Sequence, residues 1–143
     1  MLGGETVLVD TGPLVALFDP SDRQRARCRA VLETMRRARR VTTTAVLTET
    51  VYLLDFDARA QQALLAFVAA GGVEVSDLDA SELSRAAALM QRYENVPMDF
   101  ADATLVVLAE RLKTQRIFTL DRDFLVYRVG RKAFRCLPEP AAR

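Results

Sequence analysis

The sequence contains no histidine, few glycines and only two cysteines among its 143 residues. Without histidine, the chain cannot use imidazole for general acid–base chemistry, build a Ser-His-Asp triad or bind zinc through histidine. Cys28 and Cys136 are too far apart in sequence for a metal knuckle, so we interpret both as reduced thiols. Neither pair of adjacent glycines has the spacing of a Walker or dinucleotide-binding loop. If this chain is an enzyme, we therefore expect it to use carboxylates and a metal ion.

Long apolar runs are also missing. No run reaches the roughly 18 residues that span a membrane, and the N-terminal residues lack the basic and apolar regions of a signal peptide. We therefore expect a cytoplasmic protein without membrane segments. Half of the residues are hydrophobic, 27% are charged and the net charge is +1. This composition is typical of a globular protein, and the length fits one domain over residues 1–143.

Short β-branched or apolar runs alternate with longer segments of helical character. We predict strands at residues 6–9, 41–43, 73–75, 116–119 and 133–137. The predicted helices cover residues 14–18, 45–54, 58–70, 79–93 and 99–112, and a further helix is capped by Ser21 or Asp22 and continues to about residue 39. This alternation favours an α/β fold, a three-layer α/β/α sandwich with a central, mainly parallel sheet. Ligands of such folds bind at the carboxyl ends of the strands.

Five carboxylates lie inside or directly after apolar segments, where a charge is costly. They are Asp10, Glu49, Asp102, Asp121 and Asp123. A buried carboxylate must pair with a cation, bind a metal or take up a proton. No lysine or arginine lies within four positions of Glu49 or Asp102 to pair with them along a helix. Convergence of these groups would require a divalent cation, and Mg²⁺ or Mn²⁺ suits an all-oxygen site.

Each carboxylate also has a local explanation. Asp10 could cap a helix, and Glu49 could reach solvent at a helix edge. Asp121 and Asp123 could form Asx turns. Asp99 lies three residues before Asp102 and on the same helix face. It could be no more than the N-cap of that helix. The joint occurrence of these groups beside buried elements of one domain nevertheless favours a metal site.

Four short motifs resemble the PIN-domain nucleases, especially the VapC-type toxin ribonucleases, in order and spacing over nearly the whole chain. They are VDTGPL at residues 9–14, Thr48-Glu49, Asp102-Ala103 within an alanine-rich helix, and TLDRDF at residues 119–124. The resemblance implies that a catalytic quartet binds Mg²⁺ or Mn²⁺. Its members would be Asp10, Glu49, Asp102 and Asp121.

The same resemblance implies roles for further residues. Asp123 would be an auxiliary ligand or support one, and Asp99 would be an extra ligand. Thr11 and Thr119 match hydroxyl positions that orient carboxylates or a water. No position of the quartet is replaced, so we expect an active enzyme that hydrolyses RNA phosphodiester bonds and leaves a 5′-phosphate and a 3′-hydroxyl.

Partners follow from the resemblance as well. Toxins of this type act on RNA, are blocked by a cognate antitoxin whose tail covers the active site, and commonly form homodimers. Eight arginines fall between Arg23 and Arg40 but do not line one helical face. They are compatible with a solvated helix, with an RNA-backbone track or with contact to an acidic protein.

Three other functions have to be compared with an antitoxin-controlled ribonuclease. A PIN nuclease of RNA processing would have the same site but no antitoxin gene beside its own. A phosphoacceptor signalling domain would need an acidic pair on the first strand and a lysine on a late one, whereas the only lysines are Lys113 and Lys132 and no acidic pair adjoins Asp10. A non-catalytic RNA- or protein-binding module would keep the fold without metal-dependent turnover.

Overall fold

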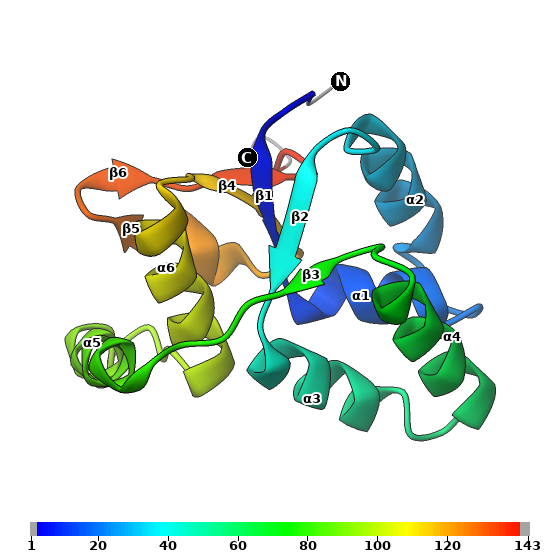
Figure 1. The fold of residues 1–143 in the computed structure, drawn as a ribbon, viewed down its shortest axis with the longest axis horizontal. Helices are drawn as coiled ribbons and strands as arrows, with labels where there is room; N and C mark the ends of the chain where they lie inside the picture. The colour runs from blue at the N-terminus through cyan, green and yellow to red at the C-terminus, as the bar shows by residue number, and fades with distance from the viewer. Residues whose placement is uncertain (1–2, 141–143) are drawn as a thin grey trace.

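A five-stranded parallel sheet forms the centre of the molecule in this computed structural model, which describes residues 3–140. The strand order is β3-β2-β1-β4-β7, and every neighbouring pair is parallel (Figure 1). The strands are β1 (Thr6–Val9), β2 (Arg39–Thr42), β3 (Glu74–Val75), β4 (Arg116–Phe118) and β7 (Arg135–Leu137). The predicted α/β fold with a mainly parallel sheet is thereby confirmed.

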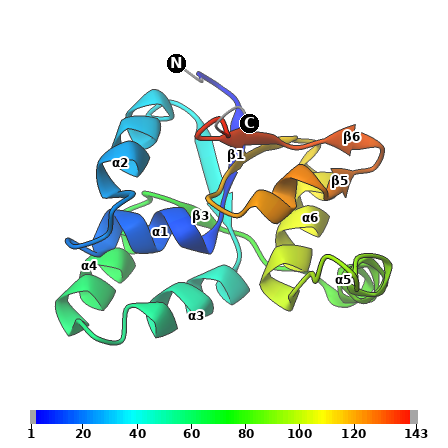
Figure 2. The same ribbon diagram turned by 180° about the vertical axis from the view of Figure 1, so that it is seen from behind.

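Within residues 3–140, six α-helices pack around this sheet. They are α1 (Thr11–Phe18), α2 (Arg25–Thr34), α3 (Thr44–Leu53), α4 (Ala58–Ala69), α5 (Ala80–Arg92) and α6 (Phe100–Leu112). Figures 1 and 2 show α1, α2 and α4 on one side of the sheet and α5 and α6 on the other. Helix α3 follows β2 and lies beneath the carboxyl ends of the strands (Figure 1). Within residues 3–140, no helix is both long enough and apolar enough to cross a membrane.

The central strand β1 is buried on both faces. Val7 and Leu8 have no exposed surface, and neither has Ile117 on the neighbouring strand β4. Strands covered by helices on both sides consist of continuous apolar runs rather than alternating ones. Helix α6 continues this core, since its residues from Ala101 to Ala109 are all buried. The carboxylate of Asp102 is therefore carried by one of the most deeply packed helices.

The second helix is shorter than the sequence predicted. Neither Ser21 nor Asp22 is its N-cap, which is Gln24, and the helix ends at Thr34 rather than near Arg39. The guanidinium of Arg40, from the following strand, donates hydrogen bonds to the carbonyl of Met35 at 2.6 Å and to that of Gly72 at 2.7 Å. Carbonyls at a helix end need such outside donors. Arg40 thus supplies a donor to the carbonyl of the residue that caps the C-terminus of α2.

The C-terminal strand prediction was also partly wrong. In place of one strand over 133–137, a two-stranded antiparallel hairpin precedes the sheet strand β7. Its strands are β5 (Arg128–Val129) and β6 (Lys132–Ala133), joined through Gly130 with a φ of 62°. A left-handed conformation of this kind favours glycine in a tight turn. A short 3₁₀ helix, η1 (Arg122–Leu125), connects β4 to the hairpin.

Packing of α6 should dominate the stability of this fold. We predict that Leu105→Ala, at a site without exposed surface, lowers the free energy of unfolding by about 2–5 kcal/mol because a core cavity forms. Leu83→Ala on α5, where the side chain is 46% exposed, is the matched helical control and should change stability by about 0.5 kcal/mol or less. Urea unfolding measures both, and equal effects would contradict the buried position of Leu105.

Candidate metal centre

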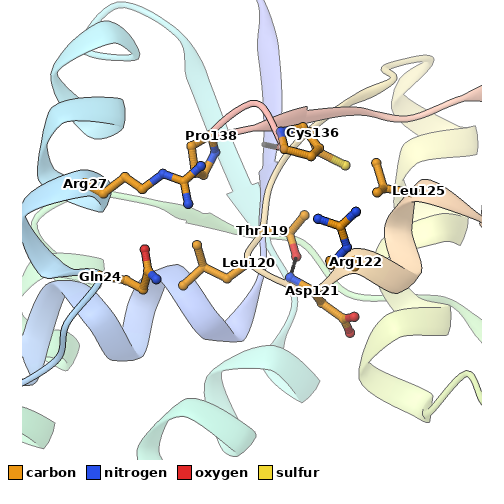
Figure 3. Close-up of a pocket in the computed structure, with 10 residues that line it drawn as sticks. Gln24, Arg27, Thr119, Leu120, Asp121, Arg122, Leu125, Cys136 and Pro138 are labelled. Carbon is orange, nitrogen blue, oxygen red and sulfur yellow. Dashed lines mark hydrogen bonds between the residues drawn. The ribbon is translucent and has the colours of Figure 1, made fainter. Parts of the chain in front are cut away.

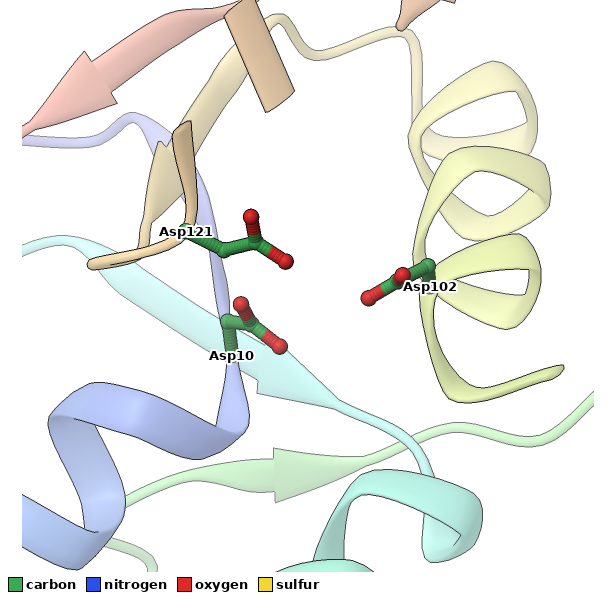
Figure 4. Close-up of side chains that lie close together, drawn as sticks. All are labelled: Asp10, Asp102 and Asp121. Carbon is green, nitrogen blue, oxygen red and sulfur yellow. The ribbon is translucent and has the colours of Figure 1, made fainter. Parts of the chain in front are cut away.

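Three aspartates converge where β1, β4 and α6 meet. Asp10 directly follows β1, Asp121 lies three residues after the end of β4, and Asp102 lies in the first turn of α6. One carboxylate oxygen from each lies within 4.8 Å of the other two. Figure 4 shows the three side chains pointing toward one another from these separate elements. The parallel pairing of β1 with β4 explains this, since it brings the carboxyl ends of both strands to one edge.

The hydroxyl of Thr119 connects two of these aspartates. It donates a hydrogen bond to Asp10 Oδ2 at 2.7 Å and accepts one from the backbone N–H of Asp121 at 2.9 Å. The other oxygen of Asp10 accepts from the backbone N–H of Thr11 at 2.8 Å, so Asp10 also caps α1. These bonds fix both oxygens of Asp10. The predicted capping role of Asp10 therefore coexists with its place in the cluster.

Asp102 is held by the start of its own helix. Its backbone N–H donates to Asp99 Oδ1 at 2.8 Å, and its Oδ2 accepts from the N–H of Asp99 at 3.4 Å, which makes a reciprocal capping box. The phenol of Tyr127 lies 3.4 Å from the same Oδ2 as a donor. The helix N-terminus also carries a partial positive charge that favours a carboxylate there. Asp99 is thus the N-cap of α6, which is one of the two roles that the sequence allowed for it.

Burial and mutual repulsion raise the pKa of the clustered carboxyls. Burial raises the pKa of Asp10 to about 6, with the charges of Asp121 and Glu49 adding to the effect. Burial also raises the pKa of Asp102 to about 8, and the negative charges of Asp99, Asp10 and Asp121 push in the same direction. Carboxylates whose charged forms are this unfavourable are characteristic of functional sites. They lack a cation.

The cluster lines a cavity of about 390 Å³ that also includes Glu49 and Asp99. Glu49 comes from the middle of α3, and burial followed by the charge of Asp99 raises its pKa. Glu49 and Asp99 thus share the cavity with the triad without belonging to the tight three-oxygen group. Asp123 does not line this cavity, and its backbone N–H instead donates to Asp121 Oδ1 at 2.9 Å.

A divalent cation fits this donor set. Every charged side chain among the described residues that line the cavity is acidic. Two oxygens on one Mg²⁺ at about 2.1 Å are at most about 4.2 Å apart, so oxygens within 4.8 Å of one another need only small movements. The hydroxyl of Thr11 is buried at the same cavity, where it lies close enough to the carboxylate of Glu49 to lower the pKa of that group against the raising effect of burial.

Sequence reasoning missed two residues of this cavity, Asp22 and Gln24. Asp22 accepts a hydrogen bond from the backbone N–H of Gln24 at 2.8 Å in the turn before α2. In the sequence this pattern indicates only a helix start, and no local signal shows that the turn folds back to the strand ends. The buried Tyr127, a donor to Asp102, was missed for the same reason.

The chain matches known proteins over most of its length. The PIN domain family model matches residues 7–130. The chain is 32% identical over 118 residues to Ribonuclease VapC26 of Mycobacterium tuberculosis, covering 81% of this chain and 87% of that protein.

Two solved structures share the fold. VapC20 of Mycobacterium tuberculosis, described as a sarcin–ricin loop cleaving toxin, superposes with a TM-score of 0.74 at 23% identity, covering 82% of this chain and 91% of that one. VapBC2 from Rickettsia felis, bound to a DNA fragment from its promoter, superposes with a TM-score of 0.67 at 14% identity, covering 92% and 98%. The family match and the identity to a curated relative together establish that this chain belongs to the PIN-domain family and is of the VapC type.

Proposed function

We propose that this chain is a divalent-metal-dependent endoribonuclease that hydrolyses RNA phosphodiester bonds, and that it is the toxin of a toxin–antitoxin pair. The observation that carries the proposal is the convergence of Asp10, Asp102 and Asp121 in a cavity whose charged residues are all acidic. The names of its relatives support the substrate, since one is called a ribonuclease and another a toxin that cleaves the sarcin–ricin loop.

The residues of the site divide the chemistry among them. A bound Mg²⁺ or Mn²⁺ would supply an activated water and charge stabilisation for the phosphate. Asp10, Asp102 and Asp121 would hold the cation, with Thr119 fixing the orientation of the first. Glu49, which lines the same cavity from α3, would complete the acidic quartet as a further ligand of the cation or of its bound water. The cleavage would leave a 5′-phosphate and a 3′-hydroxyl.

An antitoxin is proposed as the regulatory partner. A VapBC complex from Rickettsia felis is known in structure, and this chain exposes large apolar side chains near its cavity. Tyr52 is 72% exposed and Phe56 63%, and the adjacent Leu53 is exposed and also lines the acidic cavity. A protein that covered this patch would reach the cavity. Inspection of the genes adjacent to this one tests the proposal: an antitoxin gene there would support a toxin, and its absence would favour a PIN nuclease of RNA processing.

We further propose that residues 1–143 form a single domain, that it assembles as a homodimer and that it acts in the cytosol, where its RNA substrate would be. The five-stranded central sheet and one continuous hydrophobic core among residues 3–140 support the single domain. Light scattering of the purified protein tests the dimer.

The first test is RNA cleavage. Asp10→Asn and Asp102→Asn should each cut the rate at least about 100-fold, because loss of even a partner of a metal ligand costs about 10–100-fold. A panel of single-stranded and structured RNAs, including a sarcin–ricin loop, is incubated with Mg²⁺, Mn²⁺ or EDTA, and product ends are mapped. Asp55→Asn, at an exposed position away from the cavity, is the control. Cleavage that survives EDTA or both site substitutions would refute the proposal, as would a folded protein that cuts no RNA.

Thr119 should act through Asp10 and Asp121. Thr119→Val keeps the shape but removes the hydroxyl, so metal affinity and cleavage should drop by about 10–100-fold. Thr119→Ser keeps the donor and should restore most of both. Calorimetric titration with Mn²⁺ and the cleavage assay measure the effect, and a Thr119→Val protein with unchanged metal affinity would show that the hydroxyl does not orient the ligands.

The raised pKa values predict how pH affects the metal-free protein. Because the pKa of Asp10 rises to about 6 and that of Asp102 to about 8 on folding, from 3.8, the folded state binds more protons than the unfolded state in this window. The free energy of unfolding should therefore fall as pH rises from about 4 to 8. Melting temperatures in EDTA should fall less steeply for Asp102→Asn, and Mg²⁺ should stabilise the wild type more at higher pH. If the melting temperatures of the wild type and of Asp102→Asn changed with pH in the same way, the raised pKa of Asp102 would be contradicted.

A further inference from the structure

A second cavity lies directly beside the acidic one. Its volume is about 230 Å³, and it shares Gln24, Leu120 and Asp121 with the acidic cavity. Its walls come from the start of α2, from the loop after β4 and from the segment of β7 that contains Cys136. Figure 3 shows Arg27 extending into this space from α2 and Arg122 from the opposite wall, while the carboxylate of Asp121 is directed away from Cys136 and Pro138.

The two arginines are not neutralised. Five other arginines form ion pairs with glutamates, whereas within residues 3–140 neither Arg27 nor Arg122 has such a partner. Arg27 donates a single hydrogen bond, from Nη2 to the carbonyl of Glu139 at 3.1 Å, and the described residues offer the guanidinium of Arg122 none. A guanidinium has five N–H donors. Most of the hydrogen-bonding capacity of this pair is therefore free.

The chemistry of this cavity complements that of its neighbour. An acidic cluster repels a polyanion such as RNA. Even with a cation bound, the cluster would hold only the phosphate at the reacting bond. Two uncommitted guanidiniums beside it offer the paired donors that match phosphate oxygens. Leu120, Leu125 and Pro138 line the same space and provide an apolar surface for a ribose or base.

We propose that Arg27 and Arg122 form a subsite for the RNA phosphate next to the scissile one, so that the strand runs from the acidic cavity into this second cavity. The inference rests on the ribonuclease function proposed above and deepens it. It also separates Arg27 from the seven other arginines between residues 23 and 40, because Arg27 alone among them lines this cavity.

The test compares Arg27→Gln, Arg122→Gln and the double variant with Arg29→Gln, an exposed arginine of the same helix that lines neither cavity. Each pocket substitution should raise KM for RNA by roughly 10- to 100-fold, the range for a lost hydrogen bond to a charged group, and leave kcat nearly unchanged. Arg29→Gln should leave both constants unchanged. Equal effects of Arg29→Gln and the pocket substitutions would overturn the subsite.

Substrates with one neutral methylphosphonate locate the contact. A methylphosphonate at the phosphate next to the scissile one, on the side that enters the second cavity, should raise KM for the wild type. It should have no further effect on the double variant, since the neutral phosphate and the arginine substitutions remove the same contact. Additive effects, or no effect at either neighbouring phosphate, would exclude this assignment.

Binding separates this inference from the nuclease proposal. The salt slope of single-stranded RNA binding by the Asp10→Asn protein should decrease by about 0.7 in the presence of both arginine substitutions, the value for one lost phosphate contact. If the wild type cleaves RNA but the arginine substitutions change neither the salt slope nor KM, the subsite is refuted and the nuclease proposal stands. Absence of cleavage would refute the nuclease, and RNA binding that is absent or insensitive to both arginines would refute the subsite too. Weakened binding of an acidic peptide with intact RNA binding would assign the arginines to a protein partner.

Discussion

Repulsion between carboxylates held at short range is the constraint on which this structure depends. Oxygens of Asp10, Asp102 and Asp121 lie within 4.8 Å of one another, where two unit charges repel by roughly 3 kcal/mol at the effective dielectric constant of about 20 typical near a protein surface. The fold accepts this cost because β1 and β4 are parallel neighbours in a well-packed sheet and α6 is buried along most of its length. The packing of the sheet and of α6 therefore holds the three carboxylates close together despite their mutual repulsion.

Local interactions reduce this cost without removing it. The Thr119 hydroxyl and the Thr11 N–H donate to Asp10, and the backbone N–H of the N-cap Asp99 donates to the carboxylate of Asp102. These donors hold the oxygens in place, yet the pKa values of Asp10 and Asp102 remain raised because burial outweighs them. Proton uptake and cation binding are therefore alternative ways of relieving the same strain.

Sequence reasoning predicted the elements whose signals are local. The apolar run over residues 6–9 and the helix predicted over residues 79–93 correspond to β1 and α5. The rule for parallel sheets predicted a ligand site at the carboxyl ends of the strands, which is where Asp10 and Asp121 meet. The end of α2 at Thr34 was not predicted, because no glycine or proline marks it in the sequence, whereas in the structure Arg40 donates to the carbonyl of the C-cap Met35. The position of Glu49 outside the tight triad, and of Arg27 beside Glu139, which is 112 residues away, follow from tertiary packing alone.

The Thr119 hydroxyl has a further consequence for the choice of ion. It links the carboxylate of Asp10 to the backbone of Asp121 across adjacent strand ends of one sheet, so the sheet sets the relative position of these two residues. Asp102 belongs to a different layer, and its carboxylate accepts hydrogen bonds of 3.4 Å. Adjustment to cations of different radius would therefore fall on the side chain of Asp102 rather than on the pair at the strand ends.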